Sequence, residues 1–240
     1  SRRFGARAVA GVQAEMPYTN PFPFLPRSLV NLAFPYIRWT LLQVYQALHW
    51  LGLPLALTTS RRPDATEALA CGSCRYLCVG RGLPKRRVHD ALVTPLGLLG
   101  DFQTAPFVAV WGGHAGFDRA VMLWSLDVME AVNAEGGMFS PGASGEQIVV
   151  SDVDWGLLKT GVRVLIGSEV LLEVTYLKGP CRKQDGNFSQ PDAKKRINPR
   201  KFPDSARVLA KVLKPGRIAC GDRILIFGNP LGPRPILIQD

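Results

Sequence analysis

The sequence predicts a mainly β fold with a few helices (α+β), built around a closed or partly open β-barrel. From about residue 72 onward, short apolar runs rich in β-branched residues follow one another, and most are too short for a helix. The 24 glycines and 19 prolines are spread between these runs, where they form turns and end strands. Hydrophobic residues make up 47% of the chain and charged residues 20%, which is typical of a folded globular protein.

The 240 residues are expected to form three segments. A helical N-terminal appendage at residues 1–70 precedes the barrel at residues 71–228 and a C-terminal tail at residues 229–240. Between Trp39 and Thr58 no charged residue occurs, and polar side chains recur at Thr40, Gln43, Gln46 and His49. This polar stripe predicts an amphipathic helix, docked on the barrel or lying at a bilayer surface, rather than a membrane span.

The strands of the barrel are predicted from short apolar segments bounded by turn residues. Their spacing along the chain is typical of a small, mostly antiparallel barrel. The predicted strands are Arg75–Val79, Phe107–Val110, Gln147–Val150, Arg163–Ile166, Val170–Thr175, Arg207–Val212 and Arg223–Phe227.

One helix is predicted after Asp118. The Asp118 carboxylate can accept hydrogen bonds from the first free N–H groups of a helix, and an apolar run follows it. Gly136 and Gly137 are expected to end this helix, because glycine adopts the left-handed conformation that closes a helix.

The cysteines are too few for a dense disulfide framework, which favours a reducing compartment. The segment "CGSC" has the spacing of a redox dithiol or of half a zinc site, but a strand follows it, and the remaining cysteines supply no second zinc pair. The usual motifs of hydrolases, NTPases and dehydrogenases are absent from the sequence. The five cysteines are Cys71, Cys74, Cys78, Cys181 and Cys220.

The formal charge of +10 and the pI of about 9.7 indicate an anionic partner: nucleic acid, acidic lipid or a phosphorylated cofactor. A solvated basic surface explains the same charge.

Two glycine-rich stretches hold candidate binding residues. In "GDFQTAPFVAVWGGHAGFDRAV" the glycines let the backbone approach a bound group, and Asp101, Gln103, His114, Asp118 and Arg119 lie among them. In "SPGASGEQIVV" a glycine turn leads Glu146 and Gln147 into a strand, although a carboxylate in that position commonly binds backbone N–H groups of its own turn. A structural role is therefore the alternative for both stretches.

The segment "LLEVTYLKGPCRK" places one thiol, Cys181, directly after a strand and the pair Gly179-Pro180. Proline restricts the backbone before Cys181, and the neighbouring Lys178, Arg182 and Lys183 favour the reactive thiolate. Cys181 is the strongest candidate for chemistry in the chain.

In order along the chain, "GLPKRRVHDALVTPLGLLGD", "HAGFDRAVMLWS", "SGEQIVVSDVDWGLLKTGVRVLIGSEVLLEVTYLKGPC" and "RKFPDSARVLAKVLKPGRIACGDRILI" resemble the MOSC domain family, named after the C-terminal part of molybdenum cofactor sulfurases. The resemblance implies a β-barrel that carries the molybdenum cofactor (molybdopterin), with Cys181 as the molybdenum ligand or as a sulfur carrier. The resemblance also implies pyridoxal phosphate binding, as a term that applies to the family as a whole. The cofactor-binding residues that it implies are His114, Gly116, Asp118, Arg119, Gln103, Gly145, Glu146, Gln147 and Arg182.

The expected function is reduction of N-hydroxylated compounds, with electrons supplied by a separate redox protein because no flavin or haem motif occurs. The alternatives are a persulfide carrier, which needs a sulfur donor, and a basic module that binds nucleic acid or an anionic membrane without cofactor. A small-molecule substrate is expected and a nucleic-acid partner is not. The expected location is the cytoplasm, with contact to a membrane surface through residues 24–58 left open.

Overall fold

The computed structural model describes residues 63–102, 116–232 and 235–239. The helix predicted between Trp39 and Thr58 and the strand predicted at Phe107–Val110 lie outside the described residues. The described strands are β1 (Ala70–Val79), β2 (Arg86–Val88), β3 (Asp90–Thr94), β4 (Gly97–Leu98), β5 (Val121–Ser125), β6 (Ile148–Ser151), β7 (Arg163–Ile166), β8 (Val170–Lys178), β9 (Arg207–Lys214), β10 (Gly216–Ala219), β11 (Arg223–Phe227) and β12 (Ile238–Gln239), and the described α-helix is α3 (Leu126–Ala134).

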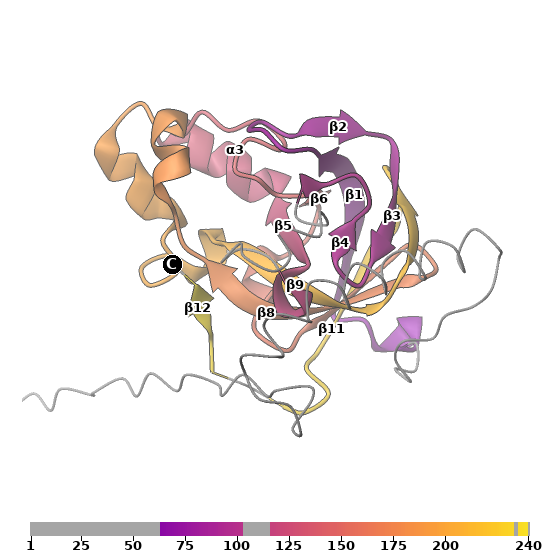
Figure 1. The fold of residues 1–240 in the computed structure, drawn as a ribbon. Helices are drawn as coiled ribbons and strands as arrows, with labels where there is room; N and C mark the ends of the chain where they lie inside the picture. The colour runs from indigo at the N-terminus through magenta and orange to yellow at the C-terminus, as the bar shows by residue number, and fades with distance from the viewer. Residues whose placement is uncertain (1–62, 103–115, 233–234, 240) are drawn as a thin grey trace, which may run out of the picture.

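Seven strands form a closed barrel (Figure 1). Their order is β11-β7-β8-β9-β5-β6-β1, and pairing of β1 with β11 closes the ring. Only the β5–β6 pair in this ring is parallel, so the prediction of a mainly antiparallel barrel is confirmed. Closure pairs the backbone groups that an open sheet would leave at its edges.

Further strands extend the barrel. β2 pairs with β1, and β12 runs parallel to β8 near the end of the described chain. A separate three-stranded sheet has the order β10-β3-β4. These strands are short, and several carry polar residues, so their apolar pattern is too weak to predict a strand.

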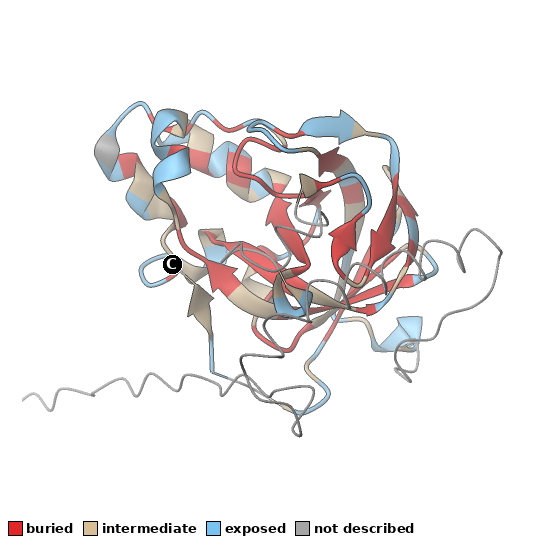
Figure 2. Cartoon of the chain, in the orientation of Figure 1, coloured by how far each residue is buried: buried red, intermediate tan, exposed pale blue. Residues whose placement is uncertain are grey.

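The strands of the barrel are largely buried (Figure 2), and their apolar side chains form a continuous core. Leu77, Ile148, Val174, Val208 and Ile224 come from five different strands, and each is fully buried. Removing such side chains from water is the main driving force for this fold, at roughly 1.5–3 kcal/mol for each one.

The helix predicted from Asp118 onward is wrong in its first half. Residues Val121–Ser125 form β5 and are all buried, because this strand lies between β9 and β6 in the barrel wall. Asp118 instead lies in the 3-10 turn Phe117–Arg119. The true N-cap of α3 is Ser125, whose hydroxyl accepts a hydrogen bond from the Val128 N–H at 3.3 Å.

The other predicted strands within the described residues are confirmed as strands. Residues 163–166 and 223–227 have the predicted bounds and pair with each other as β7 and β11. Residues 170–175 and 207–212 extend further, to Lys178 and Lys214. Among the described residues, no helix is long and apolar enough to cross a membrane.

Candidate functional site around Cys181

Cys181 follows β8 and stands at the start of a 3-10 turn, η5 (Arg182–Asn187). Its backbone is extended, with φ −122° and ψ 170°, and its carbonyl accepts a hydrogen bond from the Gln184 N–H at 3.1 Å. The thiol is free of any disulfide and the residue is partly exposed. Cys181 is therefore held by a structured loop and remains reachable from solvent.

The glycine turn at residues 140–147 is organised around Glu146. The carboxylate of Glu146 is fully buried and accepts hydrogen bonds from the Gly142 N–H at 2.6 Å, the Ser144 N–H at 3.1 Å and the Ser144 hydroxyl. Burial raises the pKa of Glu146 above its usual value, and these hydrogen bonds oppose the rise. Gly142 has φ +89°, and a Cβ there would meet the Lys85 carbonyl oxygen at 2.8 Å, so glycine is required.

Two side chains of the Cys181 loop bind carbonyls of this glycine turn. The Gln184 amide donates to the Ser144 carbonyl at 3.1 Å, and the Asn187 amide donates to the Ala143 carbonyl at 3.3 Å. Gln184 is buried, so its bond is not exchanged with bulk water. The loop that carries Cys181 and the predicted binding turn therefore form one unit, although they are distant in sequence.

Arg207, the first residue of β9, completes this unit. The Cys181 unit thus consists of residues 140–147, residues 179–187 and Arg207. The side chain of Arg207 is only 1% exposed, and it donates through Nη2 to the Gly179 carbonyl at 2.6 Å and through Nη1 to the Ser144 carbonyl at 3.2 Å. Burial lowers the pKa of Arg207 to about 10, while the negative charges of Glu146 and of ionised Cys181 oppose this shift. No local feature of the sequence indicates this role, since an arginine that begins a strand commonly faces solvent.

Two buried polar atoms of the side chains that tie the Cys181 loop to the glycine turn have no hydrogen-bond partner among the described residues. They are Nε of Arg207 and Oε1 of Gln184. Buried polar groups are nearly always paired, so an unpaired donor and an unpaired acceptor here are consistent with a polar ligand that completes the site. A soft thiolate, a buried guanidinium and a backbone-rich turn are suited to an anionic complex of a soft metal.

Gln147 has an internal structural role. Its side-chain oxygen accepts from the Met122 N–H at 2.7 Å, and its amide donates to Asp101 at 3.0 Å. Asp101 also forms a buried ion pair with Lys85, with an Nζ–Oδ1 distance of 2.8 Å. These bonds fix β5 against the glycine turn, and the role of Gln147 in cofactor binding stays a prediction.

The predicted residues Gly116, Asp118 and Arg119 lie beside β8. The Asp118 carbonyl accepts from the Thr175 hydroxyl at 2.5 Å, and the Arg119 guanidinium carbon is 5.3 Å from the centre of the Tyr176 ring. They therefore adjoin the strand that leads to Cys181. The predicted binding residues His114 and Gln103 lie outside the described residues.

The basic run at residues 194–196 offers three cations that could attract a phosphate group. Lys194 pairs with Asp185, Lys195 pairs with Asp192 at 2.5 Å, and Arg196 pairs with a glutamate, Glu135, at 2.5 Å. Because each cation already has a carboxylate partner, the run is better explained as a surface ion-pair cluster. Arg182 and Gly145 remain predicted contacts, the first exposed and the second within the glycine turn.

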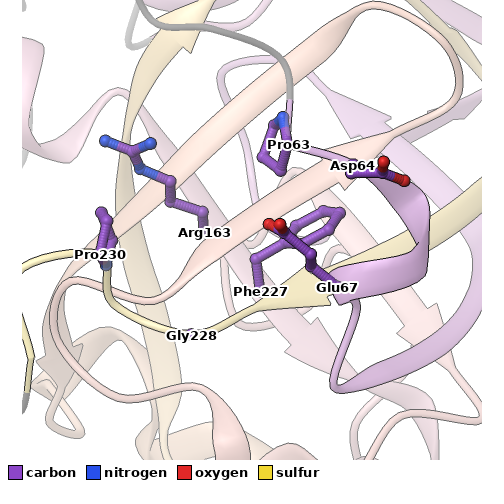
Figure 3. A pocket seen from close by; sticks show the side chains of 7 residues that line it. All are labelled: Pro63, Asp64, Glu67, Arg163, Phe227, Gly228 and Pro230. Atoms are coloured by element: carbon purple, nitrogen blue, oxygen red, sulfur yellow. The ribbon is translucent and has the colours of Figure 1, made fainter.

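A separate hollow of about 520 Å³ lies where the turn Ala65–Glu67 meets β7 and β11 (Figure 3). It contains two acids and one cation but no thiol, and it shares no lining residue with the Cys181 unit. Its lining residues are Pro63, Asp64, Glu67, Arg163, Phe227, Gly228 and Pro230.

Comparisons with known proteins agree with the fold. Residues 112–225 match the family model of the MOSC domain. A crystal structure of a hypothetical protein is 20% identical with a TM-score of 0.53, covering 69% of this chain and 72% of that chain. The crystal structure of the YuaD protein from Bacillus subtilis is 17% identical with a TM-score of 0.51, covering 65% of this chain and 94% of that chain. At these identities the similarity shows the fold.

A curated protein named "Reductase" from Gibberella moniliformis is 30% identical over 151 residues, which cover 60% of this chain and 25% of that protein. The matched part thus spans about a quarter of the length of this relative. The barrel topology and the match to the family model lead to one conclusion: residues 112–225 are part of a MOSC-type domain.

Proposed function

We propose that this protein binds a molybdenum cofactor (molybdopterin) beside Cys181 and reduces N-hydroxylated compounds, with the Cys181 sulfur as a molybdenum ligand. The observation that carries the proposal is a partly exposed thiol on a loop whose Gly179 carbonyl accepts a hydrogen bond from a buried guanidinium, which also binds the glycine turn. The curated relative named "Reductase" supports the reaction class.

The residues near Cys181 suit such a group. The thiolate is a soft ligand that matches a soft metal, and the unpaired Nε of Arg207 can donate to an anionic group. His114, Gly116, Asp118, Arg119, Gln103, Gly145, Glu146, Gln147 and Arg182 remain the proposed cofactor contacts. When bound, the cofactor supplies the exchange of electrons and of an oxygen atom with the substrate.

The chain itself provides placement rather than redox chemistry. Because Cys181 is partly exposed, a small-molecule substrate can approach this end of the barrel. The hydrogen bonds of Arg207 and Gln184 hold the Cys181 loop against the glycine turn, so little conformational freedom remains to be lost on binding. Electrons come from a separate redox protein.

A second candidate function is a persulfide carrier. The partly exposed Cys181 on a surface loop favours it, because a carrier thiol must be reached by a sulfur donor and by an acceptor. In this role Cys181 would carry labile sulfur and retain no metal.

The two functions are separated by analysing protein purified from a cofactor-competent host. The first predicts molybdenum and pterin fluorescence in the wild type and in Cys71→Ala, and their loss in Cys181→Ala. Cys71 is the matched control because it is an exposed thiol outside the Cys181 unit. Cyanide-labile sulfur without molybdenum would instead support the carrier, and neither signal would reject both functions.

A further inference from the structure

We propose that Arg207 is the positioning residue for Cys181: it ties the Cys181 loop to the glycine turn and places a buried positive charge behind the thiol. The proposal rests on Cys181 being the reactive thiol of the proposed function. It assigns a role to a residue that lies outside the predicted site.

The first argument is the set of contacts on either side of Cys181. Arg207 donates to the carbonyl of Gly179, two positions before the cysteine, and Gln184, three positions after it, donates to the same Ser144 carbonyl that Arg207 binds. Both flanks of Cys181 are therefore connected to one carbonyl of the glycine turn. Loss of either donor would free one flank of the loop.

The second argument is that Arg207 is itself fixed. The indole N–H of Trp124 donates to the Ser205 carbonyl at 3.2 Å, and that of Trp155 donates to the Ala206 carbonyl at 2.7 Å. Both tryptophans are buried, and Trp124 also packs edge-to-face on Phe139 with ring centres 4.9 Å apart. The start of β9, and with it the guanidinium, is thus anchored to the core.

The third argument concerns charge. Arg207 forms no ion pair with a carboxylate among the residues that the structure describes. Its hydrogen bond to the Gly179 carbonyl places this charge against the backbone two residues before Cys181. The neighbouring Arg182 and Lys183 are exposed, so water and salt screen them more strongly than a buried cation.

The test compares two alkylating reagents on the full chain at one fixed pH. Iodoacetamide is neutral and iodoacetate is negatively charged, and both react with the thiolate. The ratio of their rates at one cysteine therefore cancels the fraction ionised and reports the local electrostatic potential. Peptide mass spectrometry resolves Cys181 from the exposed Cys71, which serves as the control within the same molecule.

Arg207→Met is expected to lower the iodoacetate-to-iodoacetamide ratio at Cys181 by about fivefold and to leave the ratio at Cys71 unchanged. Arg207→Lys should keep the ratio within about twofold, because the charge remains, while both rates rise because one ammonium cannot span both carbonyls. Gln184→Met removes the other tie without a change of charge, so both rates should rise together at a constant ratio.

An unchanged Cys181 ratio in a folded Arg207→Met variant would overturn the electrostatic role. If that variant does not fold, unchanged rates in Arg207→Lys and in Gln184→Met would overturn the positioning role. These readouts use protein without cofactor, so absence of molybdenum from the wild type would reject the proposed function and leave this inference standing. If both alkylation rates of Cys181 in Arg207→Lys equal those of the wild type, a single ammonium is enough, which would contradict the need for two donors.

Discussion

Cys181 and the pair Cys74 and Cys78 show how differently one barrel can treat its thiols. Cys74 and Cys78 are fully buried in β1, whereas Cys181 is partly exposed on a loop bound to a buried cation. Burial raises the pKa of both Cys74 and Cys78 to about 12. The environment, rather than a cysteine motif, decides which sulfur is available for chemistry.

The contrast also explains the segment "CGSC". Cys71 and Cys74 both lie on β1, where residues three apart point to opposite faces, and the first is exposed while the second is buried. Two thiols on opposite faces of a strand do not form a redox pair. The motif lies within β1 itself, and the strand holds its two thiols apart.

The largest expected effect is on thiol reactivity. At pH 8 iodoacetamide should alkylate the buried Cys74 and Cys78 far more slowly than Cys71 and Cys181. A rise of the pKa from 9.0 to about 12 lowers the thiolate population of each buried thiol about a thousandfold. Time-resolved peptide mass spectrometry under native conditions measures this. Comparable labelling of all four thiols would remove the contrast.

Substitution by serine compares how much a buried thiol and an exposed thiol contribute to stability. Cys74→Ser places a hydroxyl in the apolar barrel wall and should lower the free energy of unfolding by about 1–3 kcal/mol. Cys71→Ser, the matched exposed control on the same strand, should change it by less than about 0.5 kcal/mol. Urea denaturation measures both, and equal costs would mean that burial does not distinguish the two positions.

A smaller effect is expected in the pH dependence of stability. Because the native-state pKa of Glu146 is raised, the native state holds its proton more tightly than the unfolded chain does. The resulting stabilisation is complete below the usual carboxyl pKa of 4.5 and is lost as the pH rises through the native pKa. Between pH 4 and pH 8, Glu146→Gln should therefore lose less stability than the wild type, by on the order of 1 kcal/mol. Parallel curves of the free energy of unfolding against pH for the two proteins would contradict this.

The smallest effect is expected outside the Cys181 unit. Lys194→Ala removes one member of an exposed ion pair with Asp185 and should change the free energy of unfolding by less than about 0.5 kcal/mol. The molybdenum content of the purified protein should remain that of the wild type. A loss of metal in this variant would extend the site to the basic run.

Much of the barrel was predictable because its strands are apolar runs bounded by turns. β7 and β11 have the predicted bounds, since a turn precedes each and one basic residue marks each start. The pattern of β5 does not distinguish a strand from a helix, because a run in which every residue is buried shows no alternation of apolar and polar side chains. Its place in the barrel wall, between β9 and β6, depends on contacts that are distant in sequence.

The candidate site was predictable to a smaller extent. Cys181 was identified from its local setting after a strand and a Gly-Pro pair, and the glycine turn from its composition. Arg207 was missed because its partners, Gly179 and Ser144, are 28 and 63 residues away along the chain. A hydrogen bond between distant backbone carbonyls and a buried guanidinium leaves no local pattern.

The most direct test of the account is X-ray absorption at the molybdenum edge of the wild type and of Cys181→Ser, whose hydroxyl can keep the metal in place. We expect the wild-type metal to have one more sulfur neighbour than the metal of the variant. Equal metal content with identical sulfur coordination in both proteins would show that Cys181 does not bind molybdenum.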